Sequence, residues 1–226
     1  MPEIIPAIMP KKFSDIEWSV GQVVGAVKMV QLDIMDGKFV KNTSWPYGVD
    51  DAASFAKVLN EEQGMPFWDE IDYELDLMIA DADKEFEKLM KLAPKRVVFH
   101  IEAIPDFGAF ISNLDPYFKE HIEIGLAINT TTPIETIEAY IADIRFVQCM
   151  GIEKIGYQGN PFDERVLDRI AALREKYPTL TISVDGAVDL ETAPLLLDAG
   201  ADRLVIGSAI FKSDDIRGMI QEFKSL

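Results

Sequence analysis

Short apolar runs rich in valine and isoleucine recur along the chain, and each has the length and composition of a buried β-strand. The runs are residues 3–9, 28–35, 72–79, 96–103, 122–129, 146–152, 180–186 and 203–209. The pattern therefore predicts a succession of strands that lie in the interior of the fold.

Segments of helical period lie between these runs. Residues 134–144 and 162–175 each place their apolar side chains on one face of a helix. Asp189 can cap, and Gly200 can end, the helix between the last two runs. Strands and helices that alternate through about eight units predict a (β/α)8 TIM barrel, because a doubly wound sheet usually needs about five or six strands. We expect residues 1–226 to form a single domain.

One connection is longer than the others. Residues 41–70 contain two irregular stretches around a short helical segment. This connection is longer than the usual one between the second and third strands. Two interpretations stay open for this excursion. It forms a lid, or it is an ordinary surface loop with Trp45 and Trp68 packed against the barrel.

Charge and cysteine content narrow the range of partners. With 22 Lys and Arg against 39 Asp and Glu, the chain has a formal net charge of −17. Such a charge repels nucleic acid and anionic membrane surfaces at long range. The only cysteine, Cys149, lies in an apolar run, and the first residues lack the pattern of a signal peptide. We therefore expect a cytoplasmic protein that binds neither nucleic acid nor membranes.

Acidic residues gather where the predicted strands end, which is where the working residues of such barrels project. The two-residue period of a strand places Gln31 on one face with Asp33. The same period aligns Glu74 with Asp76, and Asp185 ends the seventh run. Carboxylates that converge beside an apolar core are costly unless a cation or hydrogen bonds compensate. They indicate a metal site or acid–base chemistry; the alternative is a set of turn and capping acids.

Loops with small residues follow the sixth, seventh and eighth runs, with the sequences IGYQGNP, VDGAV and VIGSAIF. Loops after the last two strands form the commonest phosphate site of this fold, because small residues let backbone N–H groups approach the anion. Backbone donors would also explain how so acidic a protein holds a phosphate. The candidate phosphate ligands are Gly156, Gly159, Gly186, Ala187, Gly207 and Ser208.

Six motifs occur in the order LDIMDGKFVKN, LDLMI, FHIEA, GLAINTTTP, SVDGAV and ADRLVIGSAIF. In this order they resemble the ribulose-phosphate 3-epimerase family over nearly the whole chain. The resemblance implies that D-ribulose 5-phosphate is epimerised at C3 to D-xylulose 5-phosphate through an enediolate. It places the family's acid–base pair at Asp33 and Asp185, one ionised and one protonated. It also places the methionines that surround the reacting carbon at Met35, Met78 and Met150. Packing in the core accounts for these methionines equally well.

The chain departs from the family at the metal site. The resemblance implies a divalent ion held by two histidines and the same two aspartates, but Gln31 and Asp76 stand where the histidines would be. The donors of Gln31, Asp33, Asp76 and Asp185 are all oxygens. Oxygen donors favour Mg2+, Mn2+ or Ca2+ over Zn2+, so we expect Mg2+ or Mn2+. Loss of the metal is the main rival interpretation.

Three other positions bear on the substrate. His100 belongs to the strand-four motif and is expected to contact substrate at the barrel mouth, whereas His121 is expected at the surface of the opposite end. The resemblance implies that Pro10 stands where the family has a serine that helps to position the substrate. A related ketose phosphate therefore stays open as the substrate. Because members of the family commonly associate, we also expect a homo-oligomer.

Two other functions stay open. Decarboxylases and aldolases of the same phosphate-binding barrel group carry a D-x-K-x-x-D pattern on strand three. This chain has Asp76, Met78 and Asp81 at that spacing, so the lysine is missing. The other possibility is a non-catalytic barrel that binds phosphosugars and has lost its metal site.

Overall fold

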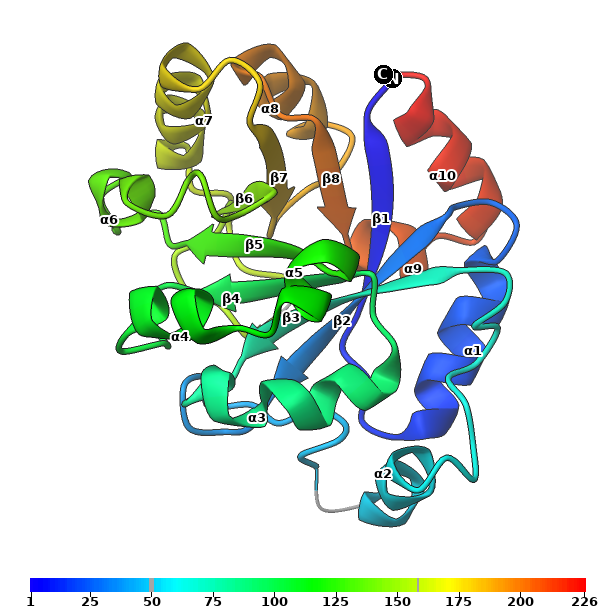
Figure 1. The fold of residues 1–226 in the computed structure, drawn as a ribbon. Coiled ribbons are helices and arrows are strands. Elements are labelled where there is room, and N and C mark those ends of the chain that lie inside the picture. The colour runs from blue at the N-terminus through cyan, green and yellow to red at the C-terminus, as the bar shows by residue number, and fades with distance from the viewer. Residues whose placement is uncertain (49–50, 158) are drawn as a thin grey trace.

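The structure, a computed structural model, describes residues 1–48, 51–157 and 159–226. Residues 49–50, within the predicted excursion, therefore lie outside the described residues. Eight parallel strands close into one barrel in sequence order, and β8 pairs with β1. Helices cover the outside of this barrel (Figure 1). The predicted (β/α)8 TIM barrel is confirmed.

Every strand falls within one of the predicted apolar runs. The strands are β1 (Glu3–Ile8), β2 (Met29–Met35), β3 (Asp72–Met78), β4 (Arg96–His100), β5 (Glu123–Ile128), β6 (Phe146–Met150), β7 (Thr181–Asp185) and β8 (Arg203–Ile206). The helices are α1 (Phe13–Val23), α2 (Ala52–Leu59), α3 (Ala82–Leu89), the 3-10 turn η1 (Met90–Leu92), α4 (Phe107–Asn113), α5 (Pro116–His121), α6 (Glu135–Glu138), α7 (Arg165–Lys176), α8 (Ala193–Ala199), α9 (Ser208–Phe211) and α10 (Ile216–Lys224). Among the described helices, none has the length and apolar character needed to cross a membrane.

Residues alternate along each strand between the outside and the inside of the barrel. Outward residues such as Leu32 pack in the main core, and inward residues form smaller separate clusters. On β2 and β3 several inward positions are polar, and Gln31 lies opposite Glu74 in the register. Two residues further on, Asp33 lies opposite Asp76. The register therefore brings two of the predicted acids to the same height in the barrel.

The two helices predicted from apolar period differ in length. Helix α7 covers nearly the whole predicted segment, residues 162–175. Helix α6 is much shorter than the predicted segment 134–144. The backbone N–H of Tyr140 donates to the Ile137 carbonyl, and that of Asp143 donates to the Tyr140 carbonyl. Because these bonds span three residues, the segment continues in turns and not in an α-helix.

Of the predicted ends of the helix between β7 and β8, the carboxyl end at Gly200 is confirmed, whereas the N-cap residue is Thr192 and Asp189 instead bonds the turn before it. Asp189 Oδ1 accepts hydrogen bonds of 2.9 Å from the backbone N–H groups of Glu191 and Thr192. Helix α8 ends before Gly200, whose φ of 114° lies in the left-handed region that glycine tolerates.

The excursion between β2 and β3 contains α2. Trp45 is 1% exposed and packs edge-on against Phe13 and Phe55, whereas Trp68 is 72% exposed. Only one of the two tryptophans is therefore packed as expected. No described residue of segment 41–70 lines the large cavity at the barrel mouth, although Asn42 Nδ2 donates at 2.8 Å to the carbonyl of Gly156, which does line it.

An ion network closes the amino-terminal end of the barrel. Arg96 lies 3.1 Å from Glu3 and 3.0 Å from Glu123, and Arg203 lies 2.9 Å and 3.3 Å from the same two acids. Glu74 is fully buried beside this network, with one oxygen 3.8 Å from Arg96 Nη1. Neither oxygen of Glu74 has a hydrogen-bond partner among the described residues. Burial raises the pKa of Glu74 from 4.5 to about 8, although Arg96 and then Arg203 lower it.

Candidate active site

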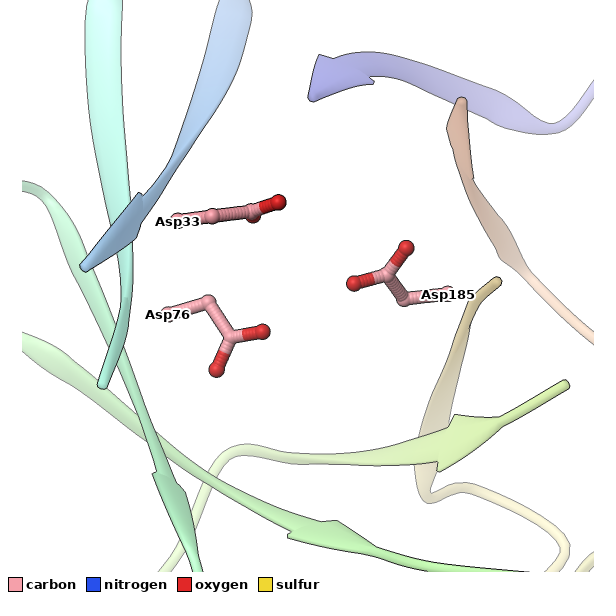
Figure 2. A group of neighbouring side chains, drawn as sticks. All are labelled: Asp33, Asp76 and Asp185. Atoms are coloured by element: carbon pink, nitrogen blue, oxygen red, sulfur yellow. The ribbon is translucent and has the colours of Figure 1, made fainter. Parts of the chain in front are cut away.

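Three aspartates converge near the carboxyl ends of the strands. Asp33 comes from β2, Asp76 from β3 and Asp185 from the end of β7. Figure 2 shows their side chains directed into the same central space. One oxygen of each carboxylate lies within 4.8 Å of the others. The structure therefore brings together the acids that the strand ends predicted.

Gln31 joins two of these acids. Its amide Nε2 donates to Asp33 Oδ1 at 2.8 Å and to Asp185 Oδ2 at 3.1 Å. Its Oε1 is buried and has no hydrogen-bond partner among the described residues. Rotation of the amide by half a turn exchanges these two atoms, because their positions are equivalent in shape. Gln31 can therefore either bridge the acids or present an oxygen to a cation.

Two side chains hold the fully buried Asp76. His100 Nε2 lies 2.9 Å from Asp76 Oδ1, and Gln148 Nε2 donates to Asp76 Oδ2 at 3.3 Å. On the other side of the imidazole, His100 Nδ1 lies 4.0 Å from Glu102 Oε2. His100 itself is 1% exposed. It therefore faces Asp76 and not the mouth of the barrel, where the sequence placed it. His121 is exposed at the amino-terminal end, as expected.

Sequence reasoning missed Gln148 and Glu102. Gln148 lies two residues before Met150 on β6, and the two-residue period that aligned Gln31 with Asp33 would have pointed to it. Glu102 is held by the loop after β5, where the backbone N–H of Asn129 donates to its Oε1 at 2.9 Å. No pattern within the strand-four motif indicates that contact.

The surroundings keep protons on the acids. Burial, followed by repulsion from Asp185 and Asp76, raises the pKa of Asp33 well above its usual range, against the hydrogen bond from Gln31. Burial and then Asp76 raise the pKa of Asp185 to about 7. Burial alone lowers the pKa of His100, but the adjacent Asp76 raises it above the usual range. At neutral pH the pair Asp33 and Asp185 therefore keeps a proton that ordinary aspartates would lose.

A cavity of about 440 Å3 opens at the carboxyl end of the barrel. Asp33, Asp185, Met78 and Met150 line it. It is also lined by all the residues predicted to bind phosphate: Gly156, Gly159, Gly186, Ala187, Gly207 and Ser208. The other predicted site residues are buried behind its wall: Gln31, Met35, Asp76 and His100.

Strand β1 contributes different residues from the one predicted. Ala7 and Met9 line the cavity, whereas Pro10 does not. The Pro10 carbonyl accepts a hydrogen bond of 2.8 Å from the backbone N–H of Trp45 and so anchors the excursion. The residues near β1 that can touch a ligand are therefore Ala7 and Met9.

The cavity has no basic side chain among the described residues that line it. Its charged residues are Asp33, Asp185 and Asp189. Gly186 and Ala187 have φ values of 103° and 52°, so the loop after β7 turns through the left-handed region. That conformation costs an alanine about 1–2 kcal/mol. A phosphate in this cavity would therefore depend on backbone N–H groups and neutral side chains such as Ser208.

The donors around the acids fit a hard divalent cation. Three carboxylate oxygens lie within 4.8 Å of one another, and the buried Gln31 Oε1 lacks a partner among the described residues. All of these donors are oxygens, which suit Mg2+ and Mn2+ better than Zn2+. Asp33 and Asp76 are buried and Asp185 is half-buried, and the single imidazole of His100 does not balance the charge of three carboxylates.

Comparison with known proteins identifies the family. The ribulose-phosphate 3 epimerase family matches residues 3–211. This chain belongs to that family. The ribulose-phosphate 3-epimerase of Schizosaccharomyces pombe is 27% identical over 99% of this chain and 92% of the relative. That of Methanocaldococcus jannaschii is 32% identical over 88% of this chain and 79% of the relative. The predicted family and enzyme class, an isomerase acting on carbohydrates, are confirmed.

A solved structure shows the same fold in a different enzyme. The 3-hexulose-6-phosphate synthase from Salmonella typhimurium superposes with a TM-score of 0.69 at 13% identity, over 99% of this chain and 97% of that one. At this identity the likeness concerns the fold alone. In the present chain, Asp81 lies outside the cavity and pairs with Lys84 at 2.8 Å. The described cavity residues include no lysine, which argues against the decarboxylase and aldolase alternative.

Proposed function

We propose that the protein interconverts D-ribulose 5-phosphate and D-xylulose 5-phosphate by exchanging the proton at C3. The observation that carries the proposal is the pair Asp33 and Asp185, which lie at the same cavity and both have a raised pKa. Their carboxylates point toward each other from β2 and β7 (Figure 2). One ionised carboxylate removes the C3 proton, and the protonated partner delivers a proton to the opposite face of the enediolate.

The cavity supplies the remaining contacts that this reaction needs. Met78 and Met150 line the same cavity as the two acids and the phosphate loops, and their apolar side chains would exclude water from the reacting carbon. We assign the phosphate to the loops after β6, β7 and β8, which line the same cavity as the two acids. The substrate is then held at one end by neutral donors and at the other by the acid pair.

We also propose that Gln31, Asp33, Asp76 and Asp185 hold a divalent cation, Mg2+ or Mn2+ in preference to Zn2+. Their oxygen donors and the unbalanced negative charge support this assignment. When bound, the cation would stabilise negative charge on the oxygens of the enediolate. A chain that works without a cation is the rival proposal.

The cellular compartment and the oligomeric state stay predictions. A reducing, cytoplasmic setting is consistent with Cys149, which is buried and free. A homo-oligomer is expected from the family resemblance, and light scattering after size-exclusion chromatography would test it.

Incubation with D-ribulose 5-phosphate in D2O tests the reaction directly. NMR should show deuterium entering at C3 in the presence of Mg2+ or Mn2+, less with Zn2+, and little with a chelator. Absence of exchange under every condition would reject the epimerase and favour a non-catalytic phosphosugar-binding barrel. Full exchange with the chelator would reject the metal assignment but keep the two-acid scheme.

A pair of matched variants locates the chemistry. Asp185→Asn should abolish exchange, because the amide cannot take or give the proton. Asp189→Asn makes the same change at the same cavity, and its side-chain oxygen can still accept from Glu191 and Thr192. Asp189→Asn should therefore keep most of the activity. Equal activity of the two variants would refute the role of Asp185.

A further inference from the structure

Asp76 is held differently from the other two acids of the cluster. Asp33 and Asp185 line the cavity and share the amide of Gln31. Asp76 lies behind the wall, and each of its oxygens contacts a separate buried side chain. Its contacts therefore have no direct part in binding substrate.

The first contact belongs to a series of side-chain contacts that runs from β3 through β4 to the loop after β5. His100 on β4 lies 2.9 Å from Asp76 Oδ1 on β3, and its other nitrogen faces Glu102 at 4.0 Å. Glu102 is anchored to the loop after β5 by the backbone of Asn129 and the hydroxyl of Thr132. The ring of Phe39 packs against the imidazole with centroids 5.5 Å apart. His100 thus has little freedom to move away from Asp76.

The second contact comes from β6, which does not adjoin β3 in the barrel. Gln148 on β6 is fully buried, and its Nε2 donates to Asp76 Oδ2 at 3.3 Å. The same nitrogen lies 3.9 Å from the sulfur of Met150. Among the described residues nothing pairs with Gln148 Oε1, so Asp76 is its principal polar partner.

We propose that His100 and Gln148 are positioning residues that together aim the Asp76 carboxylate at Asp33 and Asp185, with Glu102 behind His100. The inference rests on the proposed metal site, where Asp76 serves as a ligand. A carboxylate on a short side chain can still rotate, and donors on both oxygens remove that freedom. Partners behind a metal ligand typically change metal affinity by about 10–100-fold when they are removed.

Binding of Mn2+ alone, followed by the electron paramagnetic resonance signal of the free ion, tests this role without reference to turnover. We expect His100→Ala to weaken Mn2+ binding about 10–100-fold, because Asp76 Oδ1 loses its donor. His100→Gln, whose amide can reach the same oxygen, should recover most of the affinity. Gln148→Met keeps an unbranched side chain of similar length, removes the donor to Oδ2 and should weaken binding by a smaller factor, since the hydrogen bond from Gln148 is longer than the His100 contact.

The matched control is Val98→Ala. Val98 is buried on the same strand, two residues before His100, and lies opposite Asp76 in the strand register, but its apolar side chain offers the carboxylate no hydrogen bond. It should lower the thermal midpoint and leave Mn2+ affinity unchanged. Thermal midpoints of all variants then separate loss of folding from loss of positioning, and the His100→Gln variant keeps the test open if His100→Ala does not fold.

The outcomes separate this inference from the proposed reaction. Wild-type Mn2+ affinity in His100→Ala, or equal weakening in Val98→Ala, would overturn the positioning role while leaving the epimerase standing. A wild-type protein that binds Mn2+ but does not exchange deuterium would reject the reaction, and the variant affinities would still decide the positioning role. A wild-type protein that binds no Mn2+ would overturn the inference and the proposed metal site together.

Discussion

Glu74 should destabilise the folded protein at neutral and alkaline pH, and Glu74→Gln should relieve that cost. The carboxyl group is fully buried, and its two oxygens have no hydrogen-bond partner among the described residues. Arg96 is 3.8 Å away and already binds Glu3 and Glu123. Glutamine has nearly the same shape and cannot ionise, so the substitution removes the charge without leaving a large hole.

The size of the effect follows from the shift of the pKa from 4.5 to about 8. Because the folded value is the higher one, the cost is absent below the unfolded pKa and grows as the pH rises toward the folded pKa. One pKa unit corresponds to about 1.4 kcal/mol, so the cost is about 1 kcal/mol at pH 5.5 and about 4 kcal/mol at pH 8. The advantage of Glu74→Gln over wild type in unfolding free energy should therefore be about 3 kcal/mol larger at pH 8 than at pH 5.5.

Urea denaturation of wild type and Glu74→Gln at pH 5.5 and pH 8 measures this difference. The quantity to compare is the difference in unfolding free energy between the proteins, since other groups titrate equally in both. A gain at pH 8 that exceeds the gain at pH 5.5 supports the reasoning. If Glu74→Gln is less stable than wild type at pH 8, the ionised carboxylate is a net partner of Arg96 and the reasoning is wrong.

Two further predictions concern the barrel interior and the acid pair. Gly125→Ala places a methyl group 2.4 Å from the fully buried ring of Phe146, so it should cost about 1–3 kcal/mol in urea denaturation. Gly21→Ala, on a helix with 3.6 Å of clearance, is its control and should be neutral or stabilising. A plot of kcat/KM for epimerisation against pH should be bell-shaped. At low pH both Asp33 and Asp185 are protonated, so no base is left, and at high pH both are ionised, so no acid is left. A flat profile from pH 5 to pH 9 would contradict that scheme.

The barrel could be predicted from the sequence because its strands are buried on both faces and bounded by polar residues. Every strand falls inside a predicted run, since apolar content alone marks such strands. Helix α6 could not be predicted at its true length, because turn bonds at Tyr140 and Asp143 compete with helical ones. The exposure of Trp68 also depends on tertiary packing that local patterns do not contain.

The acid cluster could be predicted from strand period, but the side chains that hold it could not. Gln31 and Asp33 lie two residues apart on one strand, so their common direction follows from backbone geometry. The contacts of Asp76 with His100 and Gln148 join residues 24 and 72 positions apart. They depend on barrel closure and on side-chain rotation, neither of which is visible in a run of letters.

Replacement of the expected histidine by Asp76 links the proton chemistry to the cation. The carboxylate adds a negative charge that raises the pKa of Asp185 and that of Asp33. A cation among the same oxygens acts in the opposite direction, since positive charge favours the ionised acids. His100 offsets part of the added charge from behind the wall. If a cation binds as proposed, the number of protons on the acid pair would depend on how firmly it is held, and the residues proposed to position Asp76 would also influence the pH at which the pair can work.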